Sequence, residues 1–176
     1  VRKEFLVSLQ GRQTEGRDRT KGAQEGRFTL LIFGGSGGAH RINEAMMEAL
    51  NILQEKKTSL KIIHQTGSED LGWVLKSYQE RGFDALVKPF FSEMATLYEN
   101  SDLVICRSGA STVSELAVCG KAAILIPYPY AAHHHQFFNA KQLVDGCAAR
   151  MIEDGELSGP VLAEAILHLF HHPEER

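Results

Sequence analysis

Residues 28–39, FTLLIFGGSGGA, decide the fold, because they join a short apolar run to a glycine-rich turn. Such a run closed by glycines is typical of a parallel strand that is buried on both faces. Apolar residues then recur at helical spacing from Ile42 to Leu53, which predicts an amphipathic helix. A strand, a tight turn and a helix in this order predict the first half of a β-α-β unit.

The rest of the chain repeats this alternation. Further strands are expected at 60–64, 85–88, 103–106, 122–126 and 148–152, and further helices at 69–81, 92–99, 112–119, 136–145 and around 162–169. Strands that alternate with helices are joined by right-handed crossovers. The sequence therefore predicts an α/β fold, a Rossmann-like doubly wound parallel sheet of about six strands. Ligands of such sheets bind at the carboxyl ends of the strands, where the strand order reverses.

The beginning of the chain has a different composition. Residues 11–27 hold four glycines, many charges and one apolar residue, Ala23, so they cannot bury enough surface to fold by themselves. We predict a linker and mobile polar segment over 1–27 and a ligand-binding domain over 28–176. The first residue is valine and not methionine, so we expect the chain to be part of a longer protein.

Charge and composition exclude several classes of protein. A net charge of −3 and a sequence pI near 6.3 give no electrostatic reason to expect a nucleic-acid partner. The longest apolar runs, such as 122–127, are too short for a transmembrane segment. The cysteines Cys106, Cys119 and Cys147 lie far apart with no C-x-x-C pair, which predicts reduced, mostly buried thiols in a cytosolic setting and no zinc site.

The glycine-rich loop is the first candidate ligand site. Glycines let the backbone approach a ligand closely, and the helix that follows offers free N–H groups to an anion; a tight turn without a ligand is the alternative. Counted from Gly35, the pattern G-x-G-x-x-G fails at His40, and the second strand ends in His64-Gln65 where a dinucleotide site would have an acid. The sequence also lacks Gly-Lys-Ser/Thr, so we expect neither a nicotinamide dinucleotide nor a Walker-type ATP site.

The second candidate is RSGASTVSE, residues 107–115, which follows a predicted strand. Small residues and hydroxyls at a helix start suit a diphosphate. The alternative is a capping box, in which Thr112 caps the helix and Glu115 bonds the Thr112 N–H. Arg107 would then be an ordinary ion-pair partner. Spacing alone leaves the two interpretations open.

Two further stretches lie at predicted strand ends. In PYPYAAHHHQ, residues 127–136, three adjacent histidines would rarely share one metal ion, because neighbouring side chains point in different directions. Contact of His135, Gln136 and Asn139 with a polar ligand is one interpretation, and a solvent-exposed loop is the other. Of the adjacent rings at 90–91, we expect one to pack inward, and a flat wall for a base ring is the alternative role.

Together these stretches resemble the MurG family, cytoplasmic glycosyltransferases of peptidoglycan synthesis. The resemblance rests on residues 33–40, on CRSGASTVSELAVCG at 106–120, on 127–140, and on the opening VRKEFL, which is similar to that family's linker. It implies the C-terminal, donor-binding half of a two-domain GT-B enzyme that binds UDP-N-acetylglucosamine. The acceptor, a lipid-linked muramyl-pentapeptide, and the catalytic base would belong to an N-terminal domain outside this sequence. The whole enzyme would be an inverting, metal-independent hexosyltransferase, peripheral on the cytoplasmic face of the bacterial inner membrane.

The resemblance also implies roles for individual residues, without cofactor or metal. The expected donor contacts are Arg2, Ser36, Phe91, Arg107, Ala110, Ser111, Thr112, Val113, Ser114, Glu115, His135, Gln136 and Asn139, with Gly35, Gly37, Gly38 and Gly109 in the loops beside the phosphates. The backbone of Phe91 would select uracil, residues 110–112 would meet the diphosphate and sugar, Glu115 would take the ribose hydroxyls, and Gln136 would face the N-acetylglucosamine. The match has two departures. Gly37 stands where the family commonly has glutamine, and His135 stands where some members have glutamine.

Two other functions remain as alternatives. One is another GT-B relative such as a UDP-sugar 2-epimerase, which would need additional acid and base groups in its cleft. The other is a non-catalytic module that senses a nucleotide or binds a protein partner. The isolated chain is expected to bind the donor and to catalyse nothing alone.

Overall fold

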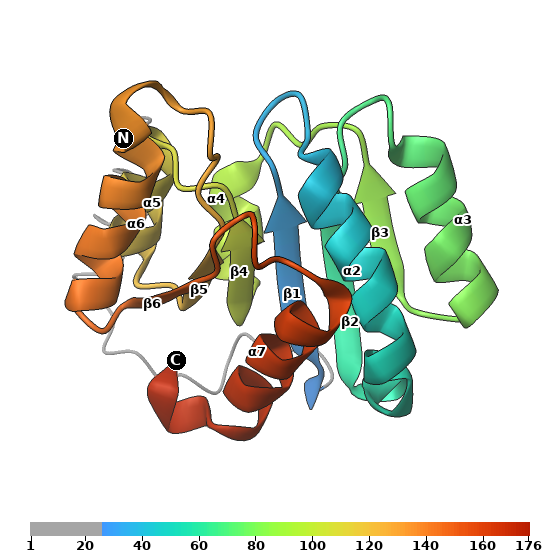
Figure 1. Cartoon of the computed structure of the whole chain (residues 1–176). Coiled ribbons are helices and arrows are strands. Elements are labelled where there is room, and N and C mark those ends of the chain that lie inside the picture. Colours follow the sequence, from blue (N-terminus) through green and yellow to red (C-terminus); the bar gives the residue numbers. More distant parts are fainter. Residues whose placement is uncertain (1–25) are drawn as a thin grey trace.

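The computed structural model describes residues 26–176, and Arg2 and most of the predicted linker lie outside the described residues. Six parallel strands form one sheet in the order β3-β2-β1-β4-β5-β6 (Figure 1). The strands are β1 (Phe28–Phe33), β2 (Leu60–Gln65), β3 (Ala85–Lys88), β4 (Leu103–Cys106), β5 (Ala123–Leu125) and β6 (Ala149–Met151). The predicted Rossmann-like doubly wound sheet is confirmed, with the strand order reversing between β1 and β4.

Helices connect the strands and cover both faces of the sheet. They are α2 (His40–Leu53), α3 (Leu71–Arg81), α4 (Met94–Glu99), α5 (Ala110–Cys119), α6 (His135–Asp145) and α7 (Gly159–His171), with short 3-10 turns η2 (Gln54–Ser59), η3 (Ala132–His134) and η4 (Pro173–Glu175). Every predicted element is present, with ends that shift by at most a few residues. Within residues 26–176 no helix is both long and apolar enough to cross a membrane.

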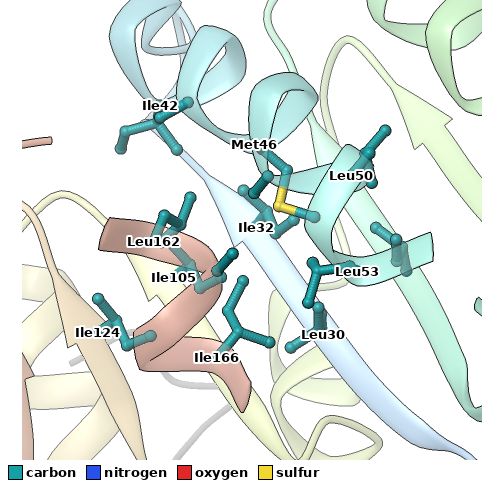
Figure 2. Packing of buried hydrophobic residues seen from close by; sticks show 14 of the residues in the cluster. Leu30, Ile32, Ile42, Met46, Leu50, Leu53, Ile105, Ile124, Leu162 and Ile166 are labelled. Atoms are coloured by element: carbon teal, nitrogen blue, oxygen red, sulfur yellow. The ribbon is translucent and has the colours of Figure 1, made fainter. Parts of the chain in front are cut away.

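The central strand β1 is buried on both faces, as its uninterrupted apolar run predicts. Leu30 and Ile32 pack into a cluster with side chains of α2, α3 and α7. Leu31 and Phe33 point to the other face, into a cluster with side chains of α4, α5 and α6. Figure 2 shows the first cluster, in which side chains from β1, β4 and β5 meet those of α2 and α7. Burial of this kind is the main force that holds the sheet and its helices together.

Helices α2 and α7 approach each other closely at Gly159. A Cβ atom on Gly159 would overlap with Glu48 and the backbone of Ala49, so only glycine permits this contact. The backbone N–H of Gly159 donates to Glu48 Oε2 at 2.9 Å. The Glu48 carboxylate therefore meets the positive end of α7, where the N-cap residue Ser158 makes no side-chain cap.

Parallel strands place their carboxyl ends at one edge of the sheet, the upper edge in Figure 1. The loops after β1, β2, β3 and β4 all leave from this edge. The fold thus gathers the sequence stretches with candidate chemistry on one side of the molecule.

Candidate functional site

The candidate site lies at the reversal point of the sheet, between the loops that follow β1 and β4. These strands are neighbours, with Phe33 paired to Cys106, so residues 34–39 and 107–109 start side by side. The first loop leads into α2 and the second into α5. In open α/β sheets the crevice at such a point is where ligands bind.

One side of the glycine-rich loop packs against the β2–α3 connection, and its other side is exposed to solvent. Gly38 has a φ of +82°, and a Cβ atom there would clash with the carbonyl oxygen of Thr66. A Cβ atom on Gly67, whose φ is +79°, would clash with the carbonyl oxygen of Gly37. The loop therefore rests directly on the β2–α3 connection, while Ser36 and its neighbours at 35 and 37 are exposed. The positive φ angles of Gly35 and Gly38 show that the turn needs glycine, and the exposed surface leaves room for a ligand.

Gln65, at the end of β2, links two of these loops. Its Nε2 donates to the carbonyl oxygen of Gly35 at 2.8 Å, and its Oε1 accepts from the backbone N–H of Phe91 at 2.8 Å. The side chain is almost fully buried. In the sequence, Gln65 stands out only because an acid is absent at the end of the second strand. A glutamine at the end of an otherwise apolar strand is the signal that could have revealed it.

A buried polar network secures the start of α2. Asn43 Nδ2 donates to the Thr66 carbonyl at 3.0 Å and to Asp70 Oδ2 at 2.7 Å, so its Oδ1 is free to accept from His64 Nε2 at 3.0 Å. His64 Nδ1 then accepts from the Tyr78 hydroxyl at 2.9 Å. These bonds satisfy a neutral imidazole, and burial lowers the pKa of His64 to about 3. The network joins β2, α2 and α3 beneath the glycine-rich loop.

Asp70 extends this network to the surface. Its carboxylate accepts from Trp73 Nε1 at 2.8 Å and bonds His40 Nδ1 at 2.9 Å. Hydrogen bonds from Trp73, Asn43 and His40 outweigh burial and lower the pKa of Asp70. The bond to Asp70 raises the pKa of His40, whose side chain is largely exposed. The first residue of α2 is thereby held against the β2–α3 loop by a charge-assisted bond.

Helix α5 begins earlier than predicted, so the capping-box interpretation is wrong. Gly109 is the N-cap residue, with an extended backbone and no side-chain cap, and Ala110 is the first helical residue. Thr112 therefore lies within the first turn, where it cannot act as the cap. Gly109 is the N-cap three residues before Thr112, and the uncapped N–H groups of the first turn lie at the carboxyl edge of the sheet.

Glu115 points into the protein. Its side chain is 2% exposed, and the Tyr98 hydroxyl donates to its Oε2 at 3.5 Å. The Glu115 charge and, more strongly, burial raise the pKa of the Cys106 thiol beside it. Cys106 and Cys119 are free and buried, as predicted, whereas Cys147 is free and exposed. To reach a ribose, the Glu115 carboxylate would have to turn away from Tyr98.

Arg107 is directed toward the β6–α7 loop. Its guanidinium donates to Asp154 Oδ1 at 2.6 Å and to the carbonyl oxygens of Ile126 and Pro127, and it lies over the Tyr128 ring. Both charged side chains are mostly buried, at 11% and 15% exposure. The ion-pair interpretation thus describes this residue, in a partly buried setting and not at the open surface.

The start of α6 is tied to the β4–α5 loop. Ser108 Oγ donates to the Gln136 carbonyl at 2.8 Å, and Asn139 Nδ2 donates to the Ser108 carbonyl at 3.0 Å. Gln136 Oε1 accepts from the Tyr128 N–H at 3.0 Å. The structure therefore joins Ser108, in the β4–α5 loop, to Gln136 and Asn139 in the first turns of α6. Ser108 is fully buried and holds the two segments in place.

The loop before α6 has an unusual backbone. His133 and His134 both have positive φ angles, near +50°, which residues other than glycine seldom adopt. His135 Nδ1 bonds the Ala132 carbonyl at 2.7 Å. Among the described residues, the group found with metal-ligand spacing is His172, Glu174 and Glu175, near the end of α7 and away from these histidines.

The two adjacent phenylalanines after β3 separate as expected. Phe91 is 7% exposed and packs in the cluster beneath α4 and α5, whereas Phe90 is 54% exposed. A buried Phe91 ring cannot form an open wall for a base, so any contact of Phe91 with a ligand would use its backbone.

These features define a class: a doubly wound α/β domain whose glycine-rich loop and uncapped helix start face each other across the reversal point of the sheet. The model of the glycosyltransferase family 28 C-terminal domain matches residues 29–176, and the chain belongs to this family.

Curated relatives agree with this assignment. The UDP-N-acetylglucosamine–N-acetylmuramyl-(pentapeptide) pyrophosphoryl-undecaprenol N-acetylglucosamine transferase of Geotalea uraniireducens is 47% identical over 98% of this chain and 46% of that protein. The transferase of the same name from Thermodesulfovibrio yellowstonii is 51% identical over 86% of this chain and 41% of its own length. The chain thus spans less than half the length of these relatives.

Solved structures give the same result. A crystal structure of Acinetobacter baumannii MurG superimposes with a TM-score of 0.75 at 35% identity, over 84% of this chain and 42% of that one. The resemblance to MurG predicted from the motifs is confirmed. A UDP-GlcNAc 2-epimerase from Neisseria meningitidis reaches a TM-score of 0.60 at 13% identity, over 97% of this chain and 44% of that one, which shows a shared fold alone.

Proposed function

We propose that this chain is the UDP-N-acetylglucosamine-binding half of a glycosyltransferase that adds N-acetylglucosamine to a lipid-linked muramyl-pentapeptide. The observation that carries the proposal is the pairing of the open glycine-rich loop with the uncapped start of α5 at the reversal point of the sheet. The names of the 47% and 51% identical relatives supply the donor and the acceptor. The acceptor site and the catalytic base would lie in a second domain at the cytoplasmic membrane surface.

The N–H groups at the α5 start provide the chemistry for the donor diphosphate. Charge builds on this group as the sugar leaves, so a site that stabilises it lowers the barrier to transfer. Aligned peptide dipoles place a partial positive charge at the α5 N-terminus, and the backbone N–H groups of 110–112 point the same way. In this proposal the helix start acts without a metal ion, and the acceptor hydroxyl attacks the anomeric carbon with inversion.

The predicted donor-contact residues differ in how well their positions in the structure support this proposal. Ser36 is exposed in the glycine-rich loop, and Ala110 and Ser111 are exposed at the start of α5. Gln136 and Asn139 bracket the expected sugar position but already bond backbone groups. Glu115 and Arg107 face away, toward Tyr98 and Asp154, so their contacts with a donor would require side-chain rotation. The predicted contact with Arg2 lies outside the described residues.

A titration of the chain by calorimetry tests donor binding. UDP and UDP-N-acetylglucosamine should bind, NAD and ATP should bind far more weakly, and a chelator should leave the affinity unchanged. Preference for NAD or ATP would refute the proposal, and a requirement for divalent cation would refute metal-independent binding. Binding of none of the four would favour a partner-binding module.

The α5 helix start can be tested with one added charge. Ser111→Asp places a carboxylate where the diphosphate is expected, so UDP should bind at least about tenfold more weakly, since like charges at close range repel. The same carboxylate favours the helix itself, so the unfolding temperature should not fall. Val161→Asp adds the same charge to the first turn of α7 and is the matched control; equal loss of binding in both variants would contradict the assignment.

Catalysis by the isolated chain is tested separately. We expect no transfer of N-acetylglucosamine to a lipid-linked acceptor until the remainder of the enzyme is supplied. Measurable transfer by the purified chain would overturn this expectation, and formation of an isomerised UDP-sugar would favour an epimerase.

A further inference from the structure

Gln65 bridges two loops that are expected, from the resemblance to the MurG family, to contact different parts of the donor. One loop, at Gly35, belongs to the expected phosphate side, and the other, at Phe91, belongs to the expected uracil side. The side chain of Gln65 bonds both, at 2.8 Å each. β2 lies between β1 and β3 in the sheet, so its last residue is the one placed to reach both neighbouring loops.

The two bonds use the two ends of one amide. The NH₂ group donates to the Gly35 carbonyl and the oxygen accepts from the Phe91 N–H, so the pair fixes the direction of the side chain. A carboxylate could serve only the Phe91 bond, and an apolar side chain could serve neither. The backbone strengthens the same connection, because the N–H groups of Thr66 and Gly67 donate to the carbonyls of Lys88 and Pro89.

We propose that Gln65 is a positioning residue for nucleotide binding, one that sets the spacing between the phosphate-binding loop and the uracil-binding loop. The inference rests on the proposed function, since it concerns the same donor site. Gln65 is 3% exposed and does not itself face solvent, so it acts through the backbone groups that it holds. A bound nucleoside diphosphate then meets loops that are already at the required separation, and no ordering of these loops opposes binding.

Two substitutions separate the two bonds. Gln65→Met keeps the length of the side chain and loses both bonds, so the dissociation constant for UDP should rise about tenfold. Gln65→Glu keeps an acceptor for the Phe91 N–H but presents a lone pair to the Gly35 carbonyl at neutral pH. When that carboxyl is protonated, it can donate to the Gly35 carbonyl. The dissociation constant of Gln65→Glu for UDP, divided by that of the natural chain, should therefore fall as pH is lowered from 8 to 5.5. Taking the ratio at each pH removes the effect of protonation of UDP itself.

The controls distinguish positioning from a general loss of stability. Ile62→Val lies on the same strand within the core and should lower the unfolding temperature without changing UDP binding. Gln54→Met removes a glutamine that bonds the Arg81 carbonyl far from the site and should change neither. If Gln65→Met does not fold, the pH dependence of Gln65→Glu provides the test.

These experiments distinguish a failure of the Gln65 inference from a failure of the proposed function. If the natural chain binds UDP and Gln65→Met binds it equally well, the inference is wrong and the proposed function stands. If Gln65→Glu is impaired to the same degree at every pH, the two-bond role of the amide is wrong. If the natural chain binds no UDP at millimolar concentration, the proposed function and this inference are both overturned.

Discussion

The loops after β1 and β2 and the loop after β5 differ sharply in how they are held. Beneath the glycine-rich loop, Gln65, Asn43 and Asp70 make buried bonds to backbone and side chains on every side. Residues 128–135 are largely exposed instead, with Tyr130 at 84%, and two of their histidines have left-handed backbones. One half of the candidate site is therefore formed before any ligand arrives, and the other half stores strain that a ligand could release.

The difference suggests that the two parts of the proposed donor site bind different parts of the donor. A nucleoside diphosphate would meet a rigid surface, which favours affinity because little ordering is required. The sugar would meet the adjustable loop, where the Gln136 side chain accepts a hydrogen bond from the Tyr128 N–H.

The largest effect is expected at Gly38. Gly38→Ala forces a Cβ atom against the Thr66 carbonyl at a φ of +82°, so it should lower the free energy of unfolding by about 3 kcal/mol through strain and overpacking. Gly37→Ala meets nothing within 4 Å and has no positive φ, so it should leave stability nearly unchanged. Urea denaturation of both variants decides this, and equal stabilities would show that the loop is not rigidly seated.

The second-largest loss of stability is expected when the Asp154–Arg107 ion pair is broken, because this pair anchors the start of the exposed loop after β5. Asp154→Ala leaves a mostly buried guanidinium with two carbonyl oxygens and the Tyr128 ring but no carboxylate, which should cost about 2 kcal/mol of stability. Asp145→Ala removes an exposed carboxylate that pairs with Lys141 and should cost under about 0.5 kcal/mol. The same denaturation measurement applies, and a smaller loss for Asp154→Ala than for Asp145→Ala would contradict the account.

Acid should lower the free energy of unfolding through His64, which lies in the buried network beneath the glycine-rich loop. Its pKa is about 3 in the folded chain and 6.5 as a free group, so between these values the unfolded state binds the extra proton. Stability therefore falls as pH falls, by about 2 kcal/mol between pH 7 and pH 5 for this group. His40, whose pKa is raised, acts in the opposite sense. The stability that His40 contributes is fully present below the pKa of the free imidazole, and it is lost as pH rises through the pKa of His40 in the folded chain.

The comparison of variants isolates the His64 contribution. His64→Gln should flatten the dependence of unfolding free energy on pH between 7 and 5, whereas His40→Gln should make it steeper. An unchanged slope in His64→Gln would mean that the buried imidazole does not control acid sensitivity.

The smallest effect is expected in the adjustable half. His134→Gly relieves a left-handed backbone at +52°, and the gain exceeds the entropy that glycine loses on folding, so stability should rise by about 0.5 kcal/mol. His135→Gly, in the helical region one residue later, should instead lower stability by up to about 1 kcal/mol. Thermal unfolding of the two variants should therefore shift in opposite directions; shifts of the same sign would remove the evidence for strain.

The fold was predictable because its signals are local and repeated. Buried runs such as 28–33 and 103–106, closed by glycine or polar residues, identify parallel strands without knowledge of their partners. The positions of the candidate loops followed, since parallel strands place all their carboxyl ends at one edge. The motif resemblance added the donor and the family, which periodicity alone could not supply.

Side-chain partners far apart in the sequence were not predictable. The Arg107 pair with Asp154 spans 47 residues, and the two bonds of Gln65 span 30 and 26. The capping box failed for a different reason, because Gly109 also favours an N-cap and begins α5 before Thr112 is reached. Capping rules rank the candidates at a helix start, and the packing of α5 on the sheet chooses between them.

The central claim is that a nucleoside diphosphate binds across the glycine-rich loop and the α5 start. Backbone amide NMR of the chain during titration with UDP tests it most directly. We expect the largest shifts in residues 34–39, at Phe91 and in 109–113, with smaller shifts in 128–139. Shifts confined to α7 and the chain end, or no shifts at millimolar UDP, would contradict it.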